Sequence, residues 1–173
     1  LVKIDLLGNR SLAVIRDALA AIATNSGRTI DYAAWDPISD TATQELIRRG
    51  DTMGCFYVES PATRLLLKKL WTTMPPAQRA QADVFEYLVA VSSIIRPAAN
   101  VFADDFVRRA HGQPYCALHP LRETVLAETH GIMVYQEDVM KVAVALGGFS
   151  VHDGDQLRKI LSKKHKERQL RDY

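Results

Sequence analysis

Residues 77–95 read AQRAQADVFEYLVAVSSII, and this stretch decides the fold. From Val84 to Ile95 an apolar side chain recurs at every third or fourth position, and further apolar residues occupy the other faces. A helix that is apolar on all sides belongs inside a protein, so the pattern predicts one long helix over 77–95 at the centre of the core. Pro97 ends it, because the residue before a proline is pushed out of the helical region.

Helical spacing continues on both sides of this stretch, interrupted by proline, glycine and capping residues. A final helix opens after Ser150, which begins a capping box with Asp153. Residues 55–58 are β-prone without a partner, and Leu1–Leu7 alternates as a short strand that Gly8 ends. The predicted fold class is mainly α: a compact helical domain over 9–173, preceded by one strand over 1–8. The other expected helices cover residues 12–22, 41–49, 61–70, 102–109, 121–129 and 139–146.

Composition narrows the class of protein. The chain has 173 residues, of which 47% are apolar and 24% charged, which excludes a disordered or low-complexity chain and suffices for a buried core. Two cysteines cannot make a disulfide framework, so we expect a reducing, cytoplasmic location. No apolar run approaches the length that spans a bilayer, so no membrane partner is expected. The start without Met and the end inside a basic segment suggest an excised piece of a longer protein.

Positive charge gathers at the C-terminal end, although the net charge is only +2. Residues 158–173 contain seven basic and two acidic side chains, whereas residues 1–157 contain fifteen basic and eighteen acidic ones. The apolar stripe of the last helix turns cationic after Ser162, and a second basic row follows another face. A polyanion partner explains this pattern, and so does a solvated helix end whose cations complement the helix dipole. The Lys and Arg side chains of both rows suit phosphate oxygens.

Lys3 and Asp5 are a second candidate pair. Residues two apart on a strand point to the same face, so this ammonium and this carboxylate project together. Such a pair could hold a divalent cation beside an anionic substrate, since Mg²⁺ is usually held by one or two carboxylates plus substrate phosphates. One Asp is not a complete site. The alternative is a surface pair on an edge strand, where Lys guards against aggregation.

Cys116 and His119, with His111 nearby, have metal-ligand spacing, but four ligands are not assembled. We expect His119 and Pro120 to fix a turn instead.

Five strings, in order along the chain, resemble the bacterial DNA polymerase III alpha subunit family. KIDLLG at 3–8 resembles its K-φ-D-φ-L-G strand, GCFYVES at 54–60 its G-V-F-Q-x-E-S segment, and IRP at 95–97 its φ-R-P-G segment. HGIMVYQEDVM at 130–140 resembles Y-G-I-φ-V-Y-Q-E-Q-V-M. GFS at 148–150, DQLRK at 155–159 and the lysines at 163–164 resemble G-F-S…D-x-L-R-R-A-M-G-K-K. Residues 73–80 look like an extra loop relative to the family.

The resemblance implies a palm–fingers fragment: 1–8 as the last palm strand and 9–173 as the N-terminal part of the fingers. In the full enzyme Asp5 would be one of three aspartates that hold two Mg²⁺ ions, and Lys3 would lie near the nucleotide phosphates. The matched basic residues of the last helix would face the incoming dNTP and the primer-template DNA; they are Arg158, Lys159, Lys163 and Lys164. Sliding-clamp and other replisome contacts would lie outside this fragment. It also implies an isolated fragment without activity.

Two other functions remain open at this stage. One is a non-enzymatic helical module that holds nucleic-acid backbone through residues 158–171. The other is a helical scaffold whose basic end docks a partner protein. The departures from the family strings, such as Ala98 and Ala99 where Gly-Pro is expected, leave an accessory or error-prone polymerase branch as open as the replicative one.

Overall fold

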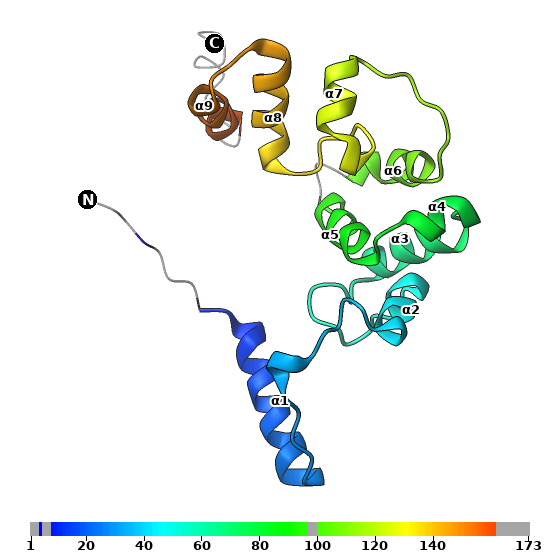
Figure 1. Cartoon of the computed structure of the whole chain (residues 1–173), viewed down its shortest axis with the longest axis vertical. Helices are drawn as coiled ribbons and strands as arrows, with labels where there is room; N and C mark the ends of the chain where they lie inside the picture. Colours follow the sequence, from blue (N-terminus) through cyan, green and yellow to red (C-terminus); the bar gives the residue numbers. More distant parts are fainter. Residues whose placement is uncertain (1–3, 5–7, 97–99, 162–173) are drawn as a thin grey trace. The chain divides into compact units, whose positions relative to one another are not determined.

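The computed structural model describes residues 4, 8–96 and 100–161 of the chain. Its secondary structure over these residues is helical and contains no β-strand, which confirms the mainly α class (Figure 1). The chain divides into two units, Leu1–Thr41 and Ala42–Tyr173. In the part that the structure describes, no helix is both long and apolar enough to cross a membrane.

The first unit contains α1 (Arg10–Ser26) and the short 3₁₀ helix η1 (Tyr32–Ala34). The Asn9 side chain caps α1 by accepting a hydrogen bond from the Ser11 N–H at 3.0 Å. The helix predicted over 12–22 is thus confirmed, and it extends by one turn at its C-terminal end. Of the strand predicted over 1–8, only Ile4 and Gly8 are described, so that prediction lies largely outside the described residues.

Helix α2 (Thr41–Arg49) begins at the last residue of the first unit, and its other residues belong to the second unit. The first half of the second unit also contains α3 (Pro61–Thr72), α4 (Pro76–Gln81) and α5 (Val84–Ile94). Ser60 caps α3, because its Oγ accepts from the Thr63 N–H at 3.2 Å. The stretch 55–58, β-prone in sequence, consists of turns and bends.

The single helix predicted over 77–95 is wrong in one respect: it is two helices that meet at residues 82–83. Asp83 causes the break. Its Oδ1 accepts from the N–H groups of Phe85 and Glu86 at 2.7 and 3.0 Å, so it starts a new helix instead of continuing the old one. Residues 73–80, expected as an extra loop, accordingly contain most of α4.

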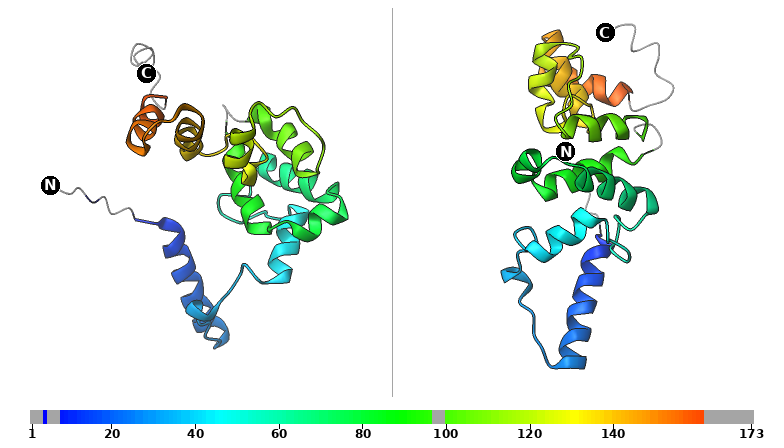
Figure 2. Two further views of the ribbon diagram at one scale, coloured as in Figure 1. Left: turned by 45° about the horizontal axis from the view of Figure 1, so that its top comes forward. Right: turned by 90° about the vertical axis from the view of Figure 1, so that its right-hand side faces the viewer.

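The second half of this unit contains a 3₁₀ turn, η2 (Asn100–Phe102), and then α6 (Ala103–Ala110). After the loop 111–119 come α7 (Pro120–Val125) and η3 (Ala127–Thr129), which replace the single helix predicted over 121–129. The chain continues with α8 (Gln136–Gly147) and α9 (Val151–Leu161), which lie side by side in both Figure 1 and Figure 2.

The core of the second unit forms where α3 packs against α5 and α6. Trp71, Val91 and Phe106 are almost fully buried there, so the stretch that decides the fold does lie in the core. Its burial is one-sided, however, because Phe85 is half exposed. The apolar side chains on the outer face of α5 therefore are not all core residues, contrary to the prediction that every face is buried.

Candidate functional site

The α8–α9 hairpin carries the two predicted phosphate-binding residues that the structure describes. Gly148 turns the chain at the end of α8 with a φ of +65°, which glycine adopts without steric cost. Ser150 then starts α9, because its Oγ accepts from the Asp153 N–H at 3.2 Å and donates to the Asp153 carboxylate at 2.6 Å. The capping pattern at 150–153 is thus confirmed. The Asp153 carboxylate accepts from the Ser150 hydroxyl here, whereas in the usual capping box it accepts from the backbone N–H of the first residue.

Close approach of the two helices depends on Gly154 of α9. A Cβ at this position would lie 3.0 Å from Met140 Cγ and 3.5 Å from Val144 Cγ2, both on α8. The absence of a side chain therefore lets the backbones pack tightly, which sets the position of the last two turns of α9. The start of α8 is equally well held, because buried Asp138 accepts from the Tyr135 N–H at 2.8 Å.

Arg158 and Lys159 lie next to each other on α9, and both are paired with Asp155. Arg158 Nε and Nη2 donate to Asp155 Oδ1 at 3.0 and 2.8 Å, and Lys159 Nζ lies 2.5 Å from Asp155 Oδ2. Arg158 Nη1 also donates to Gln136 Oε1 of α8 at 3.3 Å. One carboxylate thus orients two cations, and the group keeps a net charge of +1.

The pKa of Asp155 is lowered by its hydrogen bond to Lys159 and then by that to Arg158. The carboxylate therefore stays ionised and keeps both cations in place. Lys159 remains half exposed, with 54% of its side chain accessible, whereas Arg158 is less so at 24%. In this arrangement the ammonium is the better placed of the two to meet an anion from solvent.

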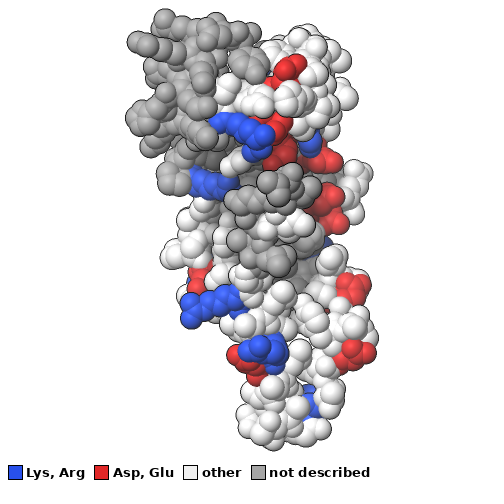
Figure 3. Space-filling model, turned by 90° about the vertical axis from the view of Figure 1, so that its left-hand side faces the viewer, with Lys and Arg blue, Asp and Glu red and all other residues white. Residues whose placement is uncertain are grey.

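The remaining predicted site residues, Lys3, Asp5, Lys163 and Lys164, lie outside the described residues. The structure therefore brings together only Arg158 and Lys159 of the predicted set. On the face drawn in Figure 3, the basic and acidic side chains of the described residues are interspersed, with no broad patch of one sign. This face therefore carries no extended cationic surface on the described residues.

Metal-ligating clusters are absent from the described residues, where no three His, Cys, Asp or Glu side chains gather. His119 caps α7, its Nδ1 accepting from the Leu121 N–H at 3.2 Å, as expected of a residue that fixes a turn. His111 Nε2 lies 2.8 Å from the Leu70 carbonyl oxygen, where it joins the loop after α6 to α3.

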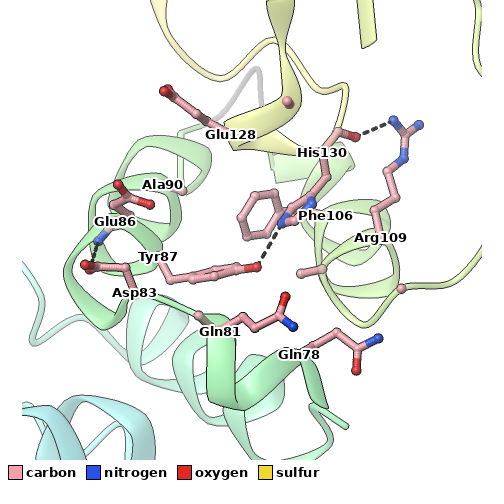
Figure 4. A pocket seen from close by; sticks show the side chains of 14 residues that line it. Gln78, Gln81, Asp83, Glu86, Tyr87, Ala90, Phe106, Arg109, Glu128 and His130 are labelled. Atoms are coloured by element: carbon pink, nitrogen blue, oxygen red, sulfur yellow. Dashed lines mark hydrogen bonds between the residues drawn. The ribbon is translucent and has the colours of Figure 1, made fainter. Parts of the chain in front are cut away.

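A cavity of about 420 Å³ opens beside α5 and contains side chains that sequence reasoning missed (Figure 4). The Tyr87 hydroxyl and His130 Nε2 share a hydrogen bond of 2.9 Å across it. Arg109 Nη1 donates to the His130 carbonyl oxygen at 2.9 Å. These contacts tie α5 and α6 to the segment before α8. His130 falls inside a string that resembles the polymerase family, but nothing in that string indicates Tyr87 as its partner.

Burial shifts the titration of both side chains of this pair. It lowers the pKa of His130, with the Arg109 charge acting in the same direction, and it raises the pKa of Tyr87, with Glu86 adding to the effect. Both groups are thereby held neutral near pH 7, which suits a structural hydrogen bond. Because this hydrogen bond joins α5 to the segment before α8, we assign the pair a packing role.

Comparisons with known proteins give the same family as the five sequence strings. The model of the bacterial DNA polymerase III alpha subunit finger domain matches residues 11–172. DNA polymerase III subunit alpha of Chlamydia pneumoniae is 38% identical over 165 residues, which are 95% of this chain and 12% of that protein. The same subunit of Mycobacterium leprae is 39% identical over 178 residues, 96% of this chain and 14% of that protein. That of Neisseria meningitidis serogroup B is 37% identical over 171 residues, 99% of this chain and 14% of that protein.

Proposed function

The chain belongs to the finger-domain family of bacterial DNA polymerase III alpha subunits, and from that premise we propose that it is the nucleotide-contacting part of a DNA-directed DNA polymerase. The chain spans 12–14% of the length of the relatives described above, so activity is proposed for a longer protein and not for these residues alone. The observation that carries the proposal is the match over 11–172, which includes the α8–α9 hairpin and its paired cations.

We place the palm–fingers boundary at residues 8–9, so that 1–8 supply the last palm strand and 9–173 the front of the fingers. Asp5 is proposed as a ligand of two Mg²⁺ ions, with other carboxylates supplied from outside this chain. When bound, such ions polarise the attacking and leaving oxygens of nucleotidyl transfer. Lys3 is proposed to contact the phosphates of the incoming dNTP. The isolated chain lacks the other ligands and is expected to be inactive.

The role proposed for α9 follows from its geometry. A dNTP triphosphate carries several negative charges, and Lys and Arg side chains contact phosphate oxygens directly. Asp155 holds Arg158 and Lys159 in one arrangement before the nucleotide arrives, so less conformational freedom is lost on binding. Lys163 and Lys164 continue this basic sequence and are proposed to contact the same substrate or the primer-template DNA. Positioning and charge neutralisation would then do most of the catalytic work.

Partners and location follow as proposals from the same premise. Primer-template DNA and dNTPs are the substrates. The sliding clamp and other replisome subunits would bind regions outside these residues. The cytoplasm is the proposed compartment.

The test uses the full-length polymerase that contains this chain. Single-nucleotide primer extension is measured against dNTP concentration for Lys159→Gln and for a matched control, Lys69→Gln. The control removes one positive charge on α3 that is paired with Asp104 of α6. We expect Lys159→Gln to raise the apparent KM for dNTP by about tenfold, the worth of one charge-assisted contact, and the control to leave it unchanged. An unchanged KM in Lys159→Gln would remove α9 from the nucleotide site.

A second variant tests the metal role. Asp5→Asn should abolish extension while the protein keeps its thermal unfolding temperature. Extension near the normal rate would refute Asp5 as a metal ligand.

A further inference from the structure

A second cavity, of about 420 Å³, opens where α2, α3 and α4 meet, and basic side chains outnumber acidic ones on its walls. Its charged lining consists of four cations and two carboxylates, a net charge of +2. The cations come from three different helices: Arg48 and Arg49 from α2, Lys68 from α3 and Arg79 from α4. None of them lies on α9, so this basic cluster is separate from the predicted phosphate-binding residues.

The carboxylates only partly compensate these cations. Glu45 is shared, since its Oε2 lies 3.7 Å from Arg48 Nη1 and also 3.7 Å from Arg79 Nη2. Both distances are long for a charge-assisted hydrogen bond, which is typically below about 3 Å. Among the described residues, no ion pair or hydrogen bond holds the Lys68 ammonium. The other lining carboxylate, Asp51, is paired with Arg49 at 3.0 Å. Glu45 therefore compensates Arg48 and Arg79 only weakly and leaves Lys68 uncompensated.

Two buried donors on the cavity lining also lack an acceptor. Arg48 Nε and Trp71 Nε1 are both buried, and neither has a hydrogen-bond partner in the described part of the chain. The side chains are adjacent, with Arg48 Cζ 5.3 Å from the centre of the Trp71 ring. Buried N–H groups are nearly always paired in native proteins, so an unpaired guanidinium N–H beside a cationic cavity indicates a missing acceptor. An anion with several oxygens would supply that acceptor and the missing charge together.

We propose that this cavity binds a phosphate group. Phosphate offers three acceptor oxygens and a charge between −1 and −2, which matches both the number of helices that present donors and the net charge of the lining. Arg48 and Arg79 would contact it through their planar donor groups and Lys68 as a mobile point charge. The phosphate comes either from a nucleic-acid backbone or from a small phosphate ligand. The proposal rests on this cavity alone and stands whether or not α9 contacts a nucleotide.

The test follows this 173-residue chain by NMR while inorganic phosphate is added. The chain has two tryptophans, Trp35 and Trp71, and only Trp71 lines the cavity, so the Trp35 indole N–H is an internal control. We expect saturable shifts of the Arg48 Nε–H and Trp71 Nε1–H signals and no shift of the Trp35 signal. Absence of a saturable shift at Arg48 would overturn the proposal.

Matched variants on one helix make the test specific. Lys68→Gln removes a cation from the cavity lining, whereas Lys69→Gln removes its neighbour, whose ammonium lies 2.6 Å from Asp104 and outside the cavity. We expect Lys68→Gln to weaken phosphate binding by about fivefold to tenfold, the worth of one charge-assisted contact, and Lys69→Gln to leave it unchanged. Equal effects of the two variants would show general charge attraction only and would refute the site.

A competition arm identifies the source of the phosphate. A DNA oligonucleotide is added to the phosphate-saturated chain. Displacement of phosphate, with the Arg48 signal held at a bound position, supports a backbone phosphate. Retention of phosphate supports a small ligand.

Discussion

Gly50, at the C-terminal end of α2, should tolerate a single added methyl group poorly. Its φ is +67°, and a Cβ there would overlap the Arg64 carbonyl oxygen, a backbone atom that cannot rotate away. Gly50→Ala should therefore lower the free energy of unfolding by about 1–2 kcal/mol for the left-handed backbone. The overlap should lower it by about 1–3 kcal/mol more. The expected loss of about 2–5 kcal/mol is a large share of the stability of an ordinary domain, about 5–15 kcal/mol.

Gly148→Ala is the matched control for this prediction. Gly148 ends α8 with a φ of +65°, but a Cβ there would meet no atom within 4 Å, so only the cost of the backbone conformation applies. Urea unfolding of the chain, followed by circular dichroism, should show Gly50→Ala to be the less stable variant by about 1–3 kcal/mol. Equal losses would mean that the contact with Arg64 relaxes freely, and the packing of α2 against α3 at this point would then be wrongly described.

Two further predictions concern titrating groups. The pKa of Asp155 is lowered, so its pairing stabilises the fold above the pKa of the unfolded chain and is lost as pH falls through the lower folded value. Asp155→Asn should therefore unfold with a shallower acid dependence than the wild type in thermal melts, and identical profiles would contradict the pairing. The pKa of His130 is lowered by burial, so the unfolded chain binds the proton more readily and stability should fall as pH drops below the ordinary histidine value of 6.5. His130→Asn, whose side chain also suits the φ of +54° at this position, should lose that slope, and a retained slope would assign it to another histidine.

Local signals explain why so many helices could be predicted. A cap such as Ser60 or Ser150 binds an N–H group three residues away. Gly50 and Gly148 end helices through their own positive φ angles. The break at Asp83 could not be predicted from the local sequence pattern. An aspartate in an apolar helical pattern can be a solvated side chain or a cap, and the neighbouring residues do not decide between these two states.

The family could also be identified without the structure. Each family string is a short run of adjacent residues, and the order of the strings can be read directly from the sequence. The chemistry of the site was harder to predict. A net charge count over 158–173 indicates a cationic end, but it does not show that one carboxylate, Asp155, binds both described cations. That pairing depends on side-chain rotamers within α9 and on the position of Gln136 across the hairpin.

Thus the sequence determined the helical class, most helix ends and the family, because each depends on residues a few positions apart. Tertiary structure alone decided which distant side chains meet. Tyr87 and His130 are 43 positions apart, and the basic cavity combines three helices. Such contacts depend on how the helices pack, since packing brings charges and hydrogen-bonding groups within a few ångströms regardless of their separation along the chain.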